Sequence, residues 1–247
     1  MKLSQKIAAA AAATLLTAGL VACSSDEEAP KPEPTATQSE TPDVEETPQA
    51  SEEPSEEPTE ETPEQAPADG NFKKAAWAKD ITIAGDLLTT VDGGDFKVEV
   101  YQVGIEKATK TGNFVDPDTN KPIIDAGDDV VYLNYLVTNT SDKEIPLSFS
   151  LVAVDAKYDD WKFIQGMDSI TDFAIEEKLG LSSSAIAPGT GEAPFAWLPG
   201  EQFAFGTNFK HQANSPITFK ARLTPALPDG KLNHDAKVEV EGAATIK

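Results

Sequence analysis

The folded part of this chain is predicted to be an all-β protein, built as an antiparallel sandwich of two sheets. Apolar and polar residues alternate with a period of two in several segments, as in strands that bury one face. All 18 aromatic residues of the 247-residue chain lie between Phe72 and Phe219, so a hydrophobic core is expected only in the C-terminal part. A single segment has helical spacing, and many strands with little helix favour a sandwich.

The N-terminus has the pattern of an export signal. Lys2 and Lys6 lead into an uncharged apolar stretch, residues 7–22. These 16 residues are fewer than the ~20 that a membrane-spanning helix needs. Residues 1–22 are therefore predicted to be a signal peptide.

The signal ends in Leu20-Val21-Ala22-Cys23, which resembles the lipobox of bacterial lipoproteins. The resemblance implies that Cys23, the only cysteine, is lipidated and holds the protein on the extracytoplasmic face of the cell membrane. Two acyl chains suffice for stable anchoring, whereas one gives marginal membrane binding. A retained membrane helix and an ordinary signal with an incidental cysteine are the alternatives.

Residues 23–70 are predicted to comprise the lipidated cysteine and a disordered Glu/Pro-rich linker. Positions 24–70 hold 16 acidic residues, one lysine, nine prolines and no aromatic residue. Such a segment buries too little apolar surface to offset the entropy of ordering. It is interpreted as a stalk or solvated spacer before a folded domain at 71–247, with direct cation capture as the alternative.

Local patterns predict the first strands of the folded domain. Gly93-Gly94 is typical of a hairpin turn. Residues 96–100 alternate and the phase then shifts, which predicts a bulge near Gln102. Residues 130–137 are apolar on both faces, as expected of a central strand.

Later strands follow from the same alternation. Residues 145–151 form a strand, and the polar run 139–144 before it predicts a hairpin with the preceding strand. The clearest alternation is at 217–223, where odd positions are apolar. Further segments bring the expected total to eight or nine strands: 203–209, 238–246, and weaker signals near Ile81, Phe163 and Phe195.

One helix is predicted after residue 169. Ser169-Ile170-Thr171-Asp172 resembles a capping box, with Ser169 as the N-cap. Ile170, Phe173 and Ala174 have helical spacing, and Gly180 is expected to end the helix.

Two short motifs carry a family resemblance. One is the strand–Asn139-Thr140-Ser141-Asp142–strand unit, and the other is Leu198-Pro199-Gly200-Glu201 followed by residues 205–209. Together they resemble a bacterial domain of unknown function with an immunoglobulin-like sandwich, common in lipoproteins and similar to domains of secreted immunogenic antigens. The resemblance spans about 95–225, leaves the role of 160–197 open, and implies no catalytic residue.

The charge balance argues against a nucleic-acid partner. With 20 Lys and Arg against 42 Asp and Glu, the net charge is −22, whereas binding a polyphosphate needs clustered cations. One cysteine and two histidines offer little basis for a transition-metal centre. No cofactor is predicted.

Asp116, Asp118 and Asn120 are the candidate metal ligands. Their oxygens have the 1, 3, 5 spacing of a calcium-binding loop. The loop departs from the EF-hand pattern at Lys121, where glycine is needed, and at Gly127, where glutamate is needed. Because Asp and Asn also favour turns, a surface turn between strands is the favoured interpretation.

The remaining candidates are interpreted as structural. His211 and His234 are expected on the surface, and Ser182-Ser183-Ser184 lacks the Gly-x-Ser-x-Gly context of a nucleophile. Core or strand-edge packing is expected for four aromatic residues, with a binding surface as the alternative: Tyr101, Tyr158, Trp161 and Trp197.

The leading hypothesis is a non-enzymatic, membrane-anchored lipoprotein of the cell envelope. Its sandwich would bind an envelope protein or a cell-wall component through loops or a sheet edge. The hypothesis follows from the anchor, the linker and the lack of a catalytic motif. The alternatives are an accessory or solute-binding component of an envelope transport complex, and a hydrolase with an unrecognised site.

Overall fold

The computed structural model describes residues 72–247. The predicted signal peptide, Cys23 and the linker lie outside the described residues. In the described part, no helix is long and apolar enough to cross a lipid bilayer.

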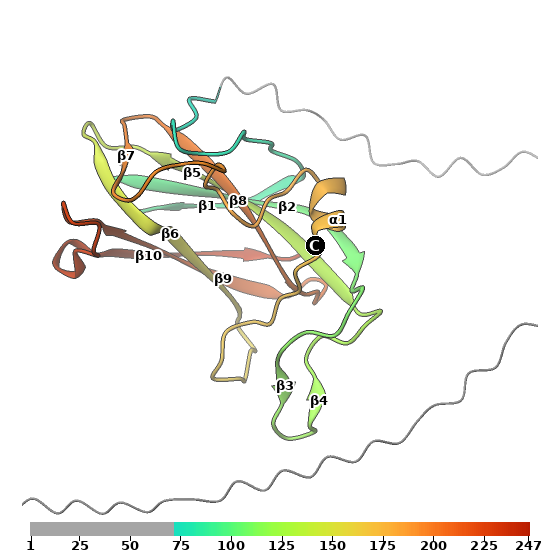
Figure 1. The fold of residues 1–247 in the computed structure, drawn as a ribbon. Helices are drawn as coiled ribbons and strands as arrows, with labels where there is room; N and C mark the ends of the chain where they lie inside the picture. The colour runs from blue at the N-terminus through green and yellow to red at the C-terminus, as the bar shows by residue number, and fades with distance from the viewer. Residues whose placement is uncertain (1–71) are drawn as a thin grey trace, which may run out of the picture. The chain divides into compact units, whose positions relative to one another are not determined.

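Two four-stranded antiparallel sheets form the described domain (Figure 1), which confirms the predicted all-β sandwich. The first contains, in spatial order, β1 (Asp86–Asp92), β2 (Phe96–Lys107), β5 (Asp129–Asn139) and β8 (Gln202–Lys210). The second contains β10 (Val238–Thr245), β9 (Pro216–Pro225), β6 (Ile145–Tyr158) and β7 (Phe195–Trp197). A separate pair is β3 (Val115–Asp116) and β4 (Lys121–Pro122).

The connections between the sheets follow the immunoglobulin pattern. β5 leads to β6 in the opposite sheet, and β8 leads to β9 in the same way. β2, β5 and β8 thus take the places of immunoglobulin strands A, B and E, while β6, β9 and β10 take those of C, F and G. The predicted hairpin across 139–144 is wrong, because the polar turn is present but its two strands belong to different sheets.

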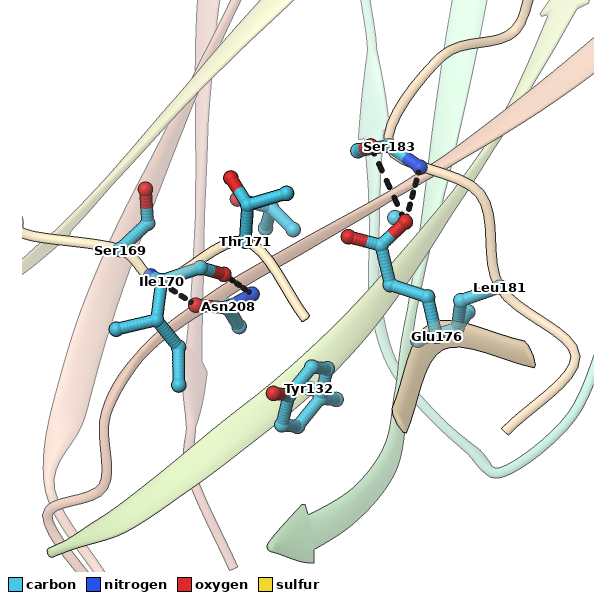
Figure 2. A pocket seen from close by; sticks show the side chains of 10 residues that line it. Tyr132, Ser169, Ile170, Thr171, Glu176, Leu181, Ser183 and Asn208 are labelled. Atoms are coloured by element: carbon cyan, nitrogen blue, oxygen red, sulfur yellow. Dashed lines mark hydrogen bonds between the residues drawn. The ribbon is translucent and has the colours of Figure 1, made fainter. Parts of the chain in front are cut away.

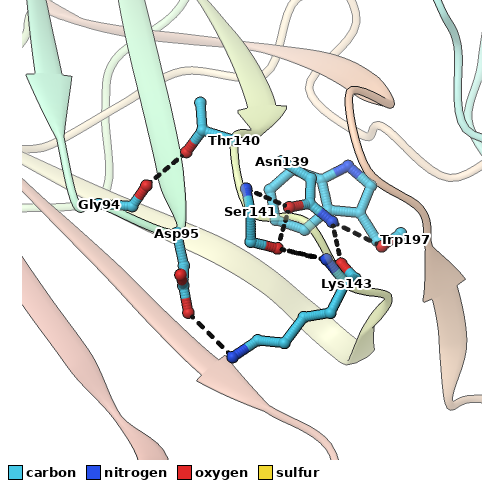
Figure 3. Close-up of polar contacts among 7 residues, drawn as sticks. All are labelled: Gly94, Asp95, Asn139, Thr140, Ser141, Lys143 and Trp197. Carbon is cyan, nitrogen blue, oxygen red and sulfur yellow. Dashed lines mark hydrogen bonds and ion pairs between the residues drawn. The ribbon is translucent and has the colours of Figure 1, made fainter.

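Asn139, the last residue of β5, ties this crossover together (Figure 3). Its side-chain amide donates to the backbone oxygens of Lys143 (3.1 Å) and Trp197 (2.8 Å). Its Oδ1 accepts hydrogen bonds from the backbone N–H (3.0 Å) and the hydroxyl (2.7 Å) of Ser141. Because Trp197 lies in β7, the buried amide links the end of β5 to the second sheet, where β6 begins.

The apolar faces of both sheets meet in one core. The odd positions that alternate in β9 are buried, as are alternate residues of β5 from Val131 to Val137. Trp197 is fully buried, its indole N–H donates to the backbone oxygen of Glu201 (2.9 Å), and its ring lies 5.4 Å from that of Phe203. Core packing is confirmed for Tyr158, Trp161 and Trp197, whereas Tyr101 is half-buried.

Two local predictions around β2 are confirmed. β1 and β2 form a hairpin at Gly93-Gly94, where the N–H of Gly93 bonds to the oxygen of Phe96 (2.8 Å) and Gly94 has a φ of 78°. The pairing of β2 with β5 shifts register between Gln102 and Gly104, which is the predicted bulge.

The weaker strand signals had mixed outcomes. The signal near Phe195 corresponds to β7, whereas no strand forms near Ile81 or Phe163. Phe163 instead packs edge-on against Trp161, with ring centroids 5.0 Å apart, and so gains burial without a strand partner. With β1, β3 and β4 added, the described residues contain ten strands rather than eight or nine.

The predicted helix is present as α1 (Phe173–Lys178), but its N-cap is Asp172 and not Ser169. The Asp172 carboxylate accepts hydrogen bonds from the backbone N–H groups of Ala174 and Ile175. The capping-box prediction is wrong because the backbone of Ile170 is bonded to Asn208 in β8, so the chain at that point cannot enter a helix.

The end of α1 agrees with the prediction that Gly180 stops the helix. Gly180 follows the helix with a φ of 65°, and the N–H groups of Gly180 and Leu181 bond to the oxygens of Glu177 and Glu176, which is a Schellman ending. The apolar residues with helical spacing do not form the buried side of α1, because Phe173 is 73% exposed whereas Glu176 is buried.

α1 and its neighbouring segments cover the outer face of the first sheet. Tyr132 and Val130 point outward from β5 and are buried against Ile170 and Leu181. This second cluster explains why β5 is apolar on both faces, as predicted. The segment between β6 and β7 therefore covers part of the outer face of the first sheet.

Replacing Asp172 with alanine is expected to lower the free energy of unfolding by about 1 kcal/mol at neutral pH, because the helix loses its N-cap. The hydroxyl of Thr109 and the backbone of Ile175 and Ala174 bond to this carboxylate and hold the pKa of Asp172 below its ordinary value. With the lower pKa in the folded state, this stabilisation is present above the ordinary pKa of about 3.9 and is lost as the pH falls through the folded-state value.

Urea unfolding at neutral pH and at about pH 3 checks this prediction. The gap in stability between wild type and Asp172→Ala should shrink at the lower pH. Asp172→Asn is the control, since asparagine caps a helix without titrating. A gap that does not change with pH would contradict the proposed role of the carboxylate charge.

Candidate functional site

The candidate calcium ligands lie at the end of β3, which holds Asp116, and in the following turn to β4, which holds Asp118 and Asn120. The carboxylate of Asp116 accepts a hydrogen bond from the backbone N–H of Asp118 (2.8 Å), and the N–H of Asn120 bonds to the backbone oxygen of Asp116 (2.7 Å). The ammonium of Lys162 lies 3.4 Å from Asp116 and 3.2 Å from Asp118. The hydrogen bond from Asp118, together with Lys162, holds the pKa of Asp116 below its usual range. The arrangement is a hydrogen-bonded turn whose carboxylates pair with a lysine.

The two histidines and the serine run are not part of a metal-binding cluster in residues 72–247. No three or more His, Cys, Asp or Glu side chains are placed there to hold a metal ion. Nε2 of His211 lies 2.8 Å from the backbone oxygen of Lys247, and His234 begins a short 3-10 helix, η1 (His234–Ala236). Ser182 accepts a hydrogen bond from the ammonium of Lys79 (2.7 Å).

The segment that connects β6 to β7 lines two cavities. One of about 80 Å³ lies between α1 and the outer face of the first sheet and is called here the helix pocket. The other, of about 310 Å³, lies between β6 and β8 beside residues 164–169 and is called the edge cleft. The cavities adjoin, because Ser169, Thr207 and Asn208 line both.

The helix pocket has a wall on each side of Tyr132 (Figure 2). Residues 169–171 form one wall, and Glu176 with Ser183 lies on the other. Asn208 holds the first wall in place, since its Oδ1 accepts from the N–H of Ile170 (2.9 Å) and its amide donates to the oxygen of Ile170 (2.7 Å). A strand side chain thus supplies both hydrogen bonds that a neighbouring strand would otherwise make.

Polar groups in the helix pocket are only partly satisfied. Oε2 of Glu176 accepts hydrogen bonds from the N–H (3.2 Å) and the hydroxyl (3.1 Å) of Ser183, while the other carboxylate oxygen points away from Ser183 (Figure 2). The hydroxyl of Tyr132 is buried without a hydrogen-bond partner among the described residues. Burial, followed by the negative charges of Asp172, Glu176 and Glu106, raises the pKa of Tyr132 to about 12.

The edge cleft lies between two incompletely paired strand edges. β6 pairs with β9 on one side, but on its other side, within the described part of the chain, only residues 145–147 pair, and they pair with β7. β8 pairs with β5 on one side, and on its other side the N–H of Gly206 bonds to the oxygen of Ser182 (2.7 Å). The sandwich therefore has an open side at residues 152–158 of β6.

The lining of the edge cleft combines apolar and polar groups. Tyr135 extends from the inner face of β5, packing edge-on against Phe205 and Phe219 with centroid distances of 5.2 Å and 6.2 Å. Its hydroxyl is buried and lacks a partner within residues 72–247. Burial, assisted by the charge of Asp155, raises the pKa of Tyr135. Other lining side chains supply both charges and apolar surface: Asp155, Lys157, Gln165, Met167 and Phe209.

Sequence reasoning missed the residues that define these cavities, namely Tyr132, Tyr135, Glu176 and Asn208. A signal was present for the tyrosines, because both lie in a strand expected to be buried on two faces. A hydroxyl in such a position needs a hydrogen-bond partner, and the strand pattern offered none.

Comparisons with known proteins add little to this geometry. No protein-family model and no curated protein sequence matches the chain. Among solved structures, it is similar to the crystal structure of a functionally unknown protein from Listeria monocytogenes EGD-e, with 13% identity. The similarity covers 71% of this chain and 85% of that chain at a TM-score of 0.27, which is too low to support a conclusion about fold or function.

Proposed function

We propose that the chain is a lipid-anchored protein of the cell envelope, and that its sandwich is a non-catalytic binding module. Cys23 carries the anchor, residues 24–70 separate the domain from the membrane, and the edge cleft holds the ligand. The observation that supports a ligand in the cleft is the buried hydroxyl of Tyr135, which lacks a partner in the described domain beside the open edge of β6.

The edge cleft suits a short extended segment of an envelope protein or of a cell-wall peptide. A free strand edge offers backbone N–H and C=O groups to an extended chain, and adjacent pockets take its side chains. Met167 and Phe209 provide apolar surface, while Asp155 and Lys157 provide one charge of each sign. The volume of about 310 Å³ is at the lower end of the range for ligand pockets, roughly 300–1,000 Å³.

Gly166→Trp is expected to block the edge cleft and abolish binding. Gly166 lines the cleft, and a Cβ added there meets no atom within 4 Å, so the fold should tolerate the larger side chain. Gly191→Trp is the matched control, because Gly191 has the same open surroundings and does not line the cleft. A photo-crosslinking amino acid at position 164, where Ile164 is 104% exposed at the cleft, reports occupancy in living cells.

The wild-type chain and Gly191→Trp should form the same crosslinked adduct, and Gly166→Trp should form about tenfold less or none. Mass spectrometry of the adduct distinguishes a protein segment from a wall peptide. Equal yields from all three chains would contradict binding in the cleft. An absence of any adduct would instead favour the alternative of a small-solute site.

A further inference from the structure

The helix pocket contains one buried oxygen atom without a hydrogen-bond partner in the described chain, the hydroxyl of Tyr132. Tyr132 is 1% exposed, and its hydroxyl has no partner in the described chain. Glu176 is 8% exposed and turns the carboxylate oxygen not bonded to Ser183 toward the opposite wall, where the hydroxyl-bearing Ser169 and Thr171 lie (Figure 2). Buried polar groups are rarely left unpaired in native proteins, so this pocket calls for a bound partner.

The charges around the pocket favour a cation. The negative charges of Asp172 and Glu176 act on the Tyr132 hydroxyl, and of these two residues Glu176 lines the pocket. Lys178 is already paired with Glu106 at 2.9 Å and does not line the pocket. An unmatched carboxylate in a shielded site attracts a positive ligand more strongly than one in open water.

We propose that the helix pocket binds a small ammonium group, either NH₄⁺ or the head of a primary amine. An ammonium group donates three or four hydrogen bonds, which the carboxylate and hydroxyl oxygens of the pocket can accept. The pocket volume of about 80 Å³ exceeds the ~15 Å³ that one ordered water needs and leaves room for a few heavy atoms. A divalent metal ion is the poorer fit, because among residues 72–247 Glu176 alone contributes a carboxylate to the lining.

This inference concerns a different cavity from the edge cleft and does not rest on the function proposed for that cleft. Thermal unfolding of the purified full chain tests it in four salts of equal ionic strength: ammonium, methylammonium, potassium and tetramethylammonium chloride. Ammonium and methylammonium should raise the Tm above the values in the other two salts, because a ligand of the folded state stabilises it. Potassium has the charge without N–H donors, and tetramethylammonium has neither donors nor a fitting size.

Glu176→Gln removes the pocket carboxylate and should raise the ammonium concentration for the half-maximal Tm shift by about tenfold or more. Glu177→Gln is the matched control, because it makes the same charge change at an exposed position of α1. This control should respond as the wild type does. Equal responses of the two variants, or equal effects of potassium and ammonium, would overturn the proposal.

Two further measurements keep the test valid if Glu176→Gln does not fold. Tyr132→Phe removes only the unpaired hydroxyl, and it should weaken the ammonium response while leaving the potassium response unchanged. In the wild type, ¹⁵N-labelled ammonium should give nuclear Overhauser contacts between its protons and the ring of Tyr132. If the pocket held only water, Tyr132→Phe would respond to ammonium as the wild type does, and no such contacts would be found.

Discussion

Asn139→Leu is expected to lower the free energy of unfolding by about 3 kcal/mol, because it leaves several buried polar groups unpaired. Leucine has a similar shape but cannot donate to the oxygens of Lys143 and Trp197 or accept from Ser141. The lost hydrogen bonds lie at the crossover that connects the first sheet to the second. We expect this loss to exceed that from any other polar residue of the segment 139–144.

Equilibrium urea unfolding, followed by tryptophan fluorescence, measures this change in stability. Ser141→Ala is the control, because it removes the hydroxyl bonds of the turn and keeps the amide bonds of Asn139 to Lys143 and Trp197. It should cost only about 1 kcal/mol. Equal losses from the two variants would show that the link between β5 and β7 does not stabilise the crossover.

Cys23→Ala is expected to shift the protein almost entirely from the membrane fraction to the soluble fraction of the envelope or the medium. The proposed anchor contributes about 0.8 kcal/mol per buried CH₂ group, and removing every acyl chain removes that contribution. The acidic segment after Cys23 offers no basic patch that could hold the protein at an anionic membrane surface.

Cell fractionation with metabolic labelling by radioactive palmitate measures this outcome. Ser24→Ala, which changes the neighbouring residue, should remain labelled and membrane-bound. Retention of Cys23→Ala in the membrane fraction would show that something other than a lipid on Cys23 anchors the chain. Failure of the wild type to incorporate palmitate would also refute lipidation.

Local patterns predicted the parts of the fold that depend on nearby residues. The alternation at 217–223 determines which side chains β9 buries, whichever strands lie beside it. The turn at Gly93-Gly94 and the bulge at Gln102 are likewise set within a few residues, and both were confirmed.

Tertiary contacts decided between two possible structures at the positions where the local sequence signals were ambiguous. The turn at 139–144 is compatible with a hairpin and with a crossover, and the amide of Asn139 selects the crossover by bonding to Trp197. Ser169 and Asp172 are both suitable N-caps, and the pairing of Ile170 with Asn208 excludes the first.

The sequence by itself determined the all-β class and the faces that its clearest strands bury, because those depend on composition and on a period of two. Only the tertiary structure decided which strands share a sheet and where the cavities lie. The helix pocket joins Tyr132 in β5 to Glu176 in α1 and Asn208 in β8. Residues so far apart in the chain meet through packing and long-range hydrogen bonds, which no local pattern specifies.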